Sequence, residues 1–309
     1  MARFAALDIG TNSIKAVVMD WDAAGAWSVA SDRVVVARLG QGVKETGRLD
    51  PAAMDRAAEA VAGLLQEVRR AGAADVAAAG TMALRTAANA GEFLDRVRRS
   101  LGLDVTVLSG EEEARLYFAA AAAGGLVPGD CNVVDIGGGS TELIQGDPSG
   151  PNARCSFHLG ALHCTERFLA GDPPPEAAFH RAAVAVDAEL AALSLIPSPT
   201  VPLVGIGGTV TTLAAIHLGL HVHDGAAIHG LALDAAVVAE LLELLRLLPL
   251  ARRRRLPGLP AERADIILGG GLILTRILAW SGHDSLRVCG WGLRHGLLLD
   301  RFGGSFLPE

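Results

Sequence analysis

A strand–turn–strand pattern that occurs twice is the feature that most constrains the fold. In the first copy, an apolar run at 4–7 leads into Asp-Ile-Gly-Thr-Asn-Ser at 8–13. In the second, a run at 132–134 leads into Asp-Ile-Gly-Gly-Gly-Ser at 135–140. Another apolar run follows each turn, which predicts a β-hairpin rather than a strand followed by a helix. A repeat on this scale predicts two similarly folded halves and not a solenoid.

The remaining segments alternate between strand and helix patterns, which is typical of an α/β protein. Asp50 followed by Pro51 predicts the start of an amphipathic helix. A third glycine turn, Gly207-Gly208-Thr209, is expected between a strand at 201–206 and a helix at 210–218. Further helices are predicted over residues 175–193, 234–248 and 261–279, and a last helix opens near Arg294.

Glycine and proline between residues 124 and 129 form the clearest break in the first half of the chain. We therefore expect two domains, residues 1–125 and 126–309, with room for the last helix to pack back on the first domain.

Composition excludes several classes of protein. Lys and Arg number 27 against 34 Asp and Glu, a net charge of −7, so a coat for nucleic acid is not expected. No apolar stretch reaches the ~18 residues of a membrane span, and Asp8 precedes any signal-peptide apolar region. The four cysteines form no CxxC pair, which indicates free thiols in a reducing compartment. We expect a cytoplasmic protein that binds neither nucleic acid nor membrane.

The chemistry of the two repeated turns favours phosphate and a divalent cation. An aspartate at the end of a strand, here Asp8 or Asp135, can hold a cation or its waters. The glycines that follow let backbone N–H groups approach an anion. Neither turn is a Walker A loop, and neither begins a helix as a dinucleotide-binding fingerprint would.

The two turns look like the phosphate turns of the actin, heat-shock and sugar-kinase superfamily. Together with GTMALRTAAN, LSGEEEARLYF, VGIGGTVTTLAAI, LPAERADIILGGGLIL and GWGLRHGLLL, they resemble the exopolyphosphatase and guanosine pentaphosphate phosphohydrolase family, in the family's order and over nearly the whole chain. The resemblance implies the short form of that family. It consists of two similar α/β domains of the actin-like, ribonuclease H-like type, with an interdomain cleft that holds the site.

The resemblance also implies roles for individual residues. Glu113 would be the catalytic base, Glu142 would help to hold water or metal with Asp135, and Mg²⁺ or Mn²⁺ would bind at Asp8 and Asp135. Glu111 and Glu112 are expected to be first-turn acids that complement the helix dipole. Arg38 is a weaker phosphate candidate. The implied phosphate-binding residues are Gly10, Thr11, Asn12, Ser13, Arg85, Gly137, Gly138, Gly139, Ser140, Gly207, Gly208 and Thr209.

The implied function is an exopolyphosphatase that releases terminal orthophosphate from inorganic polyphosphate, with a preference for short chains, and we expect a homodimer. Hydrolysis of guanosine pentaphosphate would use the same phosphate machinery and stays open. A non-catalytic module that senses polyphosphate or an alarmone is a different class of function, disfavoured by the four carboxylates Asp8, Glu113, Asp135 and Glu142. A sugar or acetate kinase is disfavoured because the Glu113 motif resembles the hydrolases.

Other clusters carry weaker signals. The spacing of Cys155, His158, His163 and Cys164 fits no usual zinc pattern, and these residues are expected in the core. The four arginines at 252–255 are expected to form a solvated helix end or a positive path for a polyanion. The family often has Tyr near His223 and Glu in place of His295. No triad partner is visible for the histidines His217, His221, His223, His229 and His295.

Overall fold

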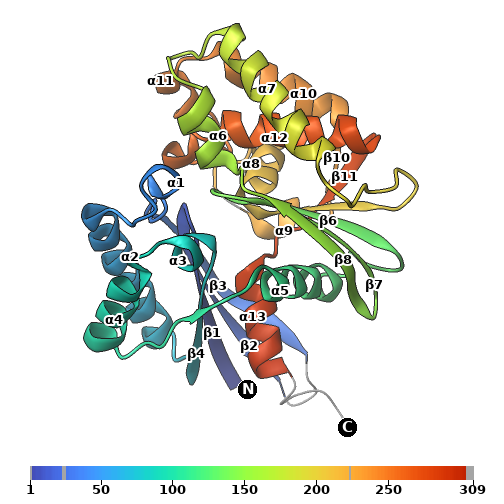
Figure 1. The fold of residues 1–309 in the computed structure, drawn as a ribbon. Coiled ribbons are helices and arrows are strands. Elements are labelled where there is room, and N and C mark those ends of the chain that lie inside the picture. The colour runs from blue at the N-terminus through green and yellow to red at the C-terminus, as the bar shows by residue number, and fades with distance from the viewer. Residues whose placement is uncertain (1, 23–25, 223, 304–309) are drawn as a thin grey trace. The chain divides into compact units, whose positions relative to one another are not determined.

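The computed structural model describes residues 2–22, 26–222 and 224–303. The chain forms two compact units (Figure 1). Unit 1 comprises Met1–Ala120 and Leu293–Glu309, and unit 2 comprises Ala121–Gly292. The last segment of the chain therefore belongs to the first unit, and the first unit ends a few residues before the glycine-rich break. Within the described ranges, no helix is long and apolar enough to span a membrane.

Unit 1 is built on a five-stranded mixed sheet with the order β3-β2-β1-β4-β5. The first three strands are antiparallel, and β4 and β5 run parallel to β1. The β1–β2 register, with Asp8 opposite Lys15 and Ile9 opposite Ile14, confirms the first predicted hairpin. The strands are β1 (Ala2–Ile9), β2 (Ser13–Trp21), β3 (Trp27–Val36), β4 (Asp75–Gly80) and β5 (Thr106–Val107).

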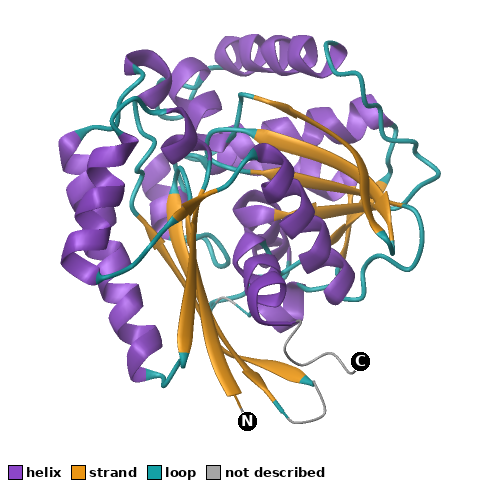
Figure 2. Cartoon of the chain, turned by 60° about the horizontal axis from the view of Figure 1, so that its bottom comes forward, coloured by secondary structure: helices purple, strands orange, loops and turns teal. Residues whose placement is uncertain are grey.

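The two faces of this sheet carry different side chains, because successive residues of a strand point to opposite faces. Leu7, Ile9 and Ala16 lie on the face that packs with α2 and α4 into one buried cluster (Figures 1 and 2). The other face carries Phe4, whose ring stacks on Phe302 of α13 with the ring centroids 4.4 Å apart. The helices are α1 (Val43–Thr46), α2 (Pro51–Arg70), α3 (Met82–Thr86), α4 (Ala90–Leu101), α5 (Gly110–Ala123) and α13 (Leu293–Phe302).

Unit 2 repeats the hairpin and extends it on both sides. Its six-stranded sheet has the order β10-β11-β9-β6-β7-β8, with β6–β7–β8 antiparallel and β6, β9 and β11 parallel. In both units a hairpin is flanked by a parallel strand, which confirms the expectation of two similar α/β halves. The strands are β6 (Cys131–Ile136), β7 (Thr141–Asp147), β8 (Gly150–Phe157), β9 (Leu203–Ile206), β10 (Ala232–Asp234) and β11 (Ser285–Val288).

A helical layer packs around α12, which is apolar along most of its length and contacts α6, α7, α8 and α10. Its buried residues belong to the large core cluster of unit 2. The helices are α6 (Ala161–Phe168), α7 (Glu176–Ala191), α8 (Gly207–His217), α9 (Gly225–Ile228), α10 (Ala235–Leu247), α11 (Leu250–Arg253) and α12 (Ile267–Ser281), with a short 3₁₀ turn η1 (Ala261–Arg263).

Three local expectations were wrong. The helix predicted over 261–279 is divided into η1 and α12, because the carboxylate of Asp265 accepts a hydrogen bond from the N–H of Ile266 and competes with the helical pattern. The third glycine turn is not a separate turn, since α8 begins at Gly207 itself. The arginine run is not wholly solvated, because Arg253 is buried.

Candidate functional site

The turn between β1 and β2 is tightened by its own backbone and by the loop that follows β3. The Gly10 N–H donates to the Ser13 carbonyl (3.1 Å), and the Asn12 carbonyl accepts from the N–H groups of Ala37 and Arg38 (3.1 and 2.9 Å). A Cβ at Gly10 would lie 2.9 Å from the Ser13 carbonyl oxygen, so this close approach requires glycine. The side chains of Thr11, Asn12 and Ser13 are all buried.

Asp8 is the second-last residue of β1, and its carboxylate is almost wholly buried. Its Oδ2 accepts from Lys15 Nζ at 3.0 Å, whereas its Oδ1 has no hydrogen-bond partner among the described residues. A buried carboxylate oxygen without a partner costs free energy unless water or a cation satisfies it. Asp8 therefore fits the role of a cation ligand, directly or through water.

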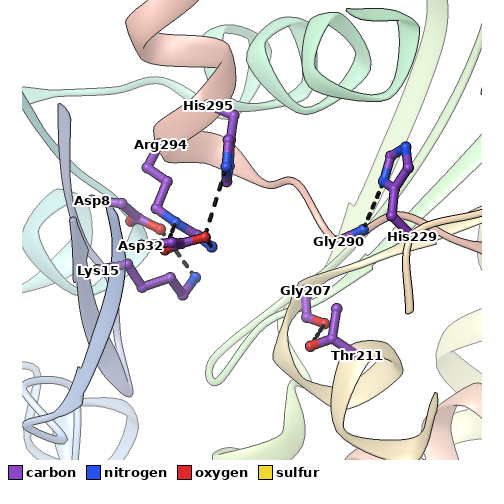
Figure 3. A network of polar contacts seen from close by, with 9 residues as sticks. All are labelled: Asp8, Lys15, Asp32, Gly207, Thr211, His229, Gly290, Arg294 and His295. Atoms are coloured by element: carbon purple, nitrogen blue, oxygen red, sulfur yellow. Dashed lines mark hydrogen bonds and ion pairs between the residues drawn. The ribbon is translucent and has the colours of Figure 1, made fainter. Parts of the chain in front are cut away.

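Three further polar residues, Asp32, Arg294 and His295, form a contact network in unit 1 (Figure 3). Arg294 of α13 donates from Nε and Nη2 to the two carboxylate oxygens of Asp32 on β3 (2.8 and 2.5 Å). His295 Nε2 lies 3.7 Å from Asp32 Oδ2. Burial opposes the charge of Arg294, but Asp32 and then Asp8 outweigh it and raise the pKa of Arg294. Arg294 is thus a permanent cation in the same electrostatic environment as Asp8.

Glu113 and Arg85 form the second part of the candidate site in unit 1. Arg85 Nη1 donates to the Leu108 carbonyl at 2.7 Å and also to the Glu113 carboxylate. Glu113 is buried, so its carboxylate is held in one orientation. Within the described chain, Nε and Nη2 of Arg85 have no hydrogen-bond partner, and the side chain is 30% exposed. Those donors are available for an anion.

The three consecutive glutamates have different environments. Glu112 forms a capping box with Ser109: its carboxylate accepts from the Ser109 N–H (2.7 Å), and its own N–H donates to Ser109 Oγ (3.2 Å). The backbone hydrogen bond from Ser109 is the main reason that the pKa of Glu112 is lowered. Glu111 is exposed. The arrangement therefore singles out Glu113 and gives Glu112 a structural role.

These residues of unit 1 gather at one edge of its sheet. The Thr81 N–H donates to the Ile9 carbonyl (3.2 Å), and the Leu108 N–H donates to the Gly80 carbonyl (2.9 Å). The carboxyl ends of β1, β4 and β5 are thereby aligned, and they lead to Asp8, Arg85 and Glu113 respectively. The carboxyl ends of parallel strands are where α/β proteins bind ligands.

The corresponding turn of unit 2 has the same backbone closure, since the Gly137 N–H donates to the Ser140 carbonyl at 3.0 Å. The register places Asp135 directly opposite Glu142, and both carboxylates are buried. Like charges opposite one another destabilise a sheet, so this pair favours a nearby cation. Ser140 Oγ donates to Glu142 Oε1 at 2.5 Å.

The start of α8 completes the site in unit 2. Gly207 has a φ of +89°, and a Cβ there would lie 2.2 Å from Asp135 Oδ1. At Gly208 a Cβ would lie 2.2 Å from Nη2 of Arg263. Burial lowers the pKa of Arg263 to about 10, against the opposing effect of Asp135 and Asp265. Arg263 remains a cation at neutral pH and lies beside Asp135 at the N-terminus of α8.

Sequence reasoning missed Lys15, Asp32, Arg263 and Arg294. Lys15 could have been found, since the hairpin register places it opposite Asp8. The other three reach the site through the tertiary fold. Arg294 and Asp32, for example, are 262 positions apart.

The other candidate clusters have structural roles or lie elsewhere. In residues 2–22, 26–222 and 224–303, no group of three or more His, Cys, Asp or Glu is arranged to hold a metal ion, and all four cysteines are free thiols. His229 accepts from the Gly290 N–H at Nδ1 (3.3 Å), so its Nε2 donates to the Gly124 carbonyl (2.9 Å). Its ring stacks on Trp291. His223 lies outside the described residues.

Comparisons with known proteins show what the whole chain is similar to. Exopolyphosphatase 2 of Mycobacterium tuberculosis is 34% identical over an alignment of 327 positions, which covers 98% of this chain and 99% of the relative. A guanosine-5'-triphosphate,3'-diphosphate pyrophosphatase of Aeromonas hydrophila is 29% identical over 306 positions, covering 98% of this chain and 60% of the relative.

A crystal structure of the Aquifex aeolicus Ppx/GppA family member has a TM-score of 0.83 at 32% identity, over 99% of both chains. This likeness confirms the predicted fold class. The model of the Ppx/GppA phosphatase family matches residues 17–303. The chain belongs to the Ppx/GppA phosphatase family.

Proposed function

We propose that this protein is an exopolyphosphatase, which hydrolyses the terminal phosphoanhydride bond of inorganic polyphosphate and releases orthophosphate. The observation that carries the proposal is the buried Glu113 carboxylate, held by Arg85 at the carboxyl edge of the unit 1 sheet. The name of the Mycobacterium tuberculosis relative, which matches almost the entire chain, supports it.

Glu113 acts as the general base. Its carboxylate orients a water molecule and accepts one proton as the water oxygen forms a bond to the terminal phosphorus. The bond from that phosphorus to the bridging oxygen breaks, and the shortened polyphosphate leaves. Phosphoryl transfer of this kind needs an in-line nucleophile and neutralised equatorial oxygens. The free donors of Arg85 and the backbone N–H groups of the two turns stabilise that charge.

Asp8 and Asp135 are the residues that would hold Mg²⁺ or Mn²⁺. The unpartnered Oδ1 of Asp8 and the opposed carboxylates of Asp135 and Glu142 fit such a cation. With so few protein ligands, water and phosphate oxygens would fill the remaining positions, as Mg²⁺ prefers. When bound, the cation neutralises charge on the phosphoryl oxygens.

Guanosine pentaphosphate is the second candidate substrate. The Aeromonas relative bears the name of an enzyme for that nucleotide, and the same phosphate machinery would serve both reactions. Retention of Asp8, Glu113, Asp135 and Glu142 disfavours a purely sensing role. The protein acts in the cytoplasm as a homodimer. Light scattering, which measures the mass of the assembly, would test the dimer.

The test is release of orthophosphate from polyphosphates of defined length, beside guanosine pentaphosphate and ATP. We expect a higher kcat/KM with polyphosphates than with guanosine pentaphosphate or ATP. A higher kcat/KM with guanosine pentaphosphate would replace the proposed substrate, and binding of polyphosphate without any release of phosphate would leave only the sensing role.

A further inference from the structure

The arginine run at 252–255 divides into one buried and three exposed side chains. Arg253 is buried and its Nη2 lies 3.5 Å from Asp172 Oδ1, so it supports the fold. Arg254 and Arg255 are exposed, and neither has a carboxylate partner in the described part of the chain. Two neighbouring, uncompensated guanidinium groups repel one another and attract an anion.

Arg254 and Arg255 line a cavity of about 330 Å³ in unit 2. His221 and Thr212 contribute polar side chains to its wall, and Ala215, Leu220 and the chain from Leu256 to Pro260 contribute the rest. The pair is therefore not merely spread over a convex surface: its members border a hollow that also contains a hydroxyl and an imidazole.

The segment that follows these arginines, residues 258–263, runs antiparallel to α8. At one end Gly258, with a φ of +81°, is pressed against the helix so closely that a Cβ would lie 2.3 Å from the Ala215 carbonyl. At the other end Arg263 covers Gly208. Positions 208, 212 and 215 share one helix face. At about 1.5 Å of rise per residue, the segment spans about 10 Å along it.

One face of α8 thus connects two positive sites. Arg263 lies at the helix N-terminus, beside Asp135 and the candidate phosphate turn. Arg254 and Arg255 lie near its C-terminal part. The C-terminus of a helix carries only about half a negative charge. The two positive charges of Arg254 and Arg255 outweigh it, so this region remains positive. The net charge of −7 gives no general attraction for a polyanion, so local charges must provide it.

We propose that Arg254, Arg255 and His221 form a subsite for the non-reacting phosphates of a polyphosphate chain whose reacting end lies at the N-terminus of α8. The inference rests on the proposed function. Guanidinium groups suit this task because they bind phosphate oxygens in a bidentate manner. A chain must span α8 to reach the subsite, so affinity should rise with chain length and then level off. A fairly short polyphosphate is long enough to reach the subsite, whereas triphosphate gains little affinity from it.

The test is a double variant, Arg254→Gln with Arg255→Gln, studied on the full chain. Arg181→Gln with Arg252→Gln is the matched control, because it removes two exposed charges that do not line the cavity. Wild type should show a KM that falls with chain length to a plateau. In the double variant we expect KM for long chains to rise about tenfold or more, because the loss of one charged hydrogen bond weakens binding by at least that factor. KM for triphosphate and kcat should be unchanged.

Direct binding separates this inference from the proposed function. Labelled long-chain polyphosphate is titrated into each protein, with orthophosphate and GTP as competitors. Weaker binding in the double variant alone supports the subsite, even if the wild type proves unable to hydrolyse polyphosphate, a result that would overturn only the proposed function. Equal affinity and equal KM in the double variant and the control would overturn the subsite. Displacement by low concentrations of orthophosphate or GTP would show a site for that anion and contradict a polyphosphate tail.

Discussion

The turns at Asp8 and Asp135 have the same sequence pattern and the same backbone closure, but different surroundings. Asp8 forms an ion pair with Lys15 of its own hairpin, and Arg294 of α13 adds positive charge. Asp135 lies against Gly207 at the start of α8 and interacts electrostatically with Arg263. Glu142 of its own hairpin lies directly opposite it. One local motif therefore has two electrostatic environments.

This difference shows that the backbone motif determines where phosphate oxygens can bind, whereas its neighbours determine what else the turn can do. The carboxylate of Asp8 has one paired and one unpartnered oxygen, which suits a cation ligand. The Asp135 carboxylate is positioned by a helix end and a buried arginine. In addition, unit 1 contains the candidate base. The two turns are accordingly not interchangeable, and the predictions below test that asymmetry.

The largest effect is expected at the base in unit 1. Glu113→Gln keeps the size of the side chain and its contact with Arg85 but removes the proton acceptor. We expect the rate of phosphate release to fall by about 10²–10⁴, with polyphosphate affinity little changed. The measurement is steady-state hydrolysis beside equilibrium binding. Glu112→Gln is the control and should matter much less, because Glu112 only caps α5. Turnover at the wild-type rate in Glu113→Gln would contradict the assignment.

The second prediction compares the two aspartates as cation ligands. Excess EDTA should abolish hydrolysis, and Mg²⁺ or Mn²⁺ should restore it. Asp8→Asn should raise the metal concentration for half-maximal activity by about tenfold or more, because the one amide oxygen would face Lys15 and an NH2 group, which cannot bind a cation, would replace the unpartnered Oδ1. Asp135→Asn should raise it less, since Glu142 lies opposite. Full activity in EDTA, with no metal found by elemental analysis, would refute the cation role of both residues.

Features that depend on residues close together in the sequence could be predicted, and features that depend on residues far apart could not. Local signals were sufficient for the hairpins and for α2, where Asp50 accepts from the Ala53 N–H at 3.0 Å, as an N-cap does. The edge strand β3 was not predicted. None of its residues is buried, and its apolar residues do not alternate regularly with polar ones, as is common at sheet edges.

Site residues show the same division. Glu113 and Arg85 each belong to a recognisable motif, but their contact joins positions 28 apart and could be seen only in the structure. Arg263 lies next to Asp135 because Gly208 has no side chain, a relation between distant segments that no local pattern expresses. Sequence reasoning therefore found the turns, while the charges around them required the fold.

The third prediction concerns the start of α8 beside Asp135 in unit 2. Gly207→Ala introduces a Cβ at positive φ and against Asp135 Oδ1. Gly219→Ala is the control, because its φ is +62° and a Cβ there would meet open space. Each should lose about 1–3 kcal/mol of stability from backbone strain, measured by urea unfolding. Only Gly207→Ala should also lose activity, about tenfold or more, because the Asp135 carboxylate must move. Equal activity in both variants would show that the position of Asp135 is unimportant.

The smallest effect is expected from thiol chemistry, which distinguishes the units because all four cysteines lie in unit 2. Burial raises the pKa of Cys131 to about 11 and that of Cys164 to about 12. Since the thiolate is the reactive form, raising the pH through 9 should leave both unreactive toward iodoacetamide in the native protein. Cys155, which is partly exposed, should react first.

Labelling of Cys131 and Cys164 therefore reports the opening of unit 2. The buried clusters of the two units contain separate sets of residues, so we expect separate opening. Asp32→Ala breaks the ion pair with Arg294 in unit 1 and should destabilise that unit. The labelling rates of the two buried thiols, followed by mass spectrometry, should nevertheless stay unchanged. Faster labelling in Asp32→Ala would show that the units open as one cooperative body, and the asymmetry between the turns would then be confined to charge.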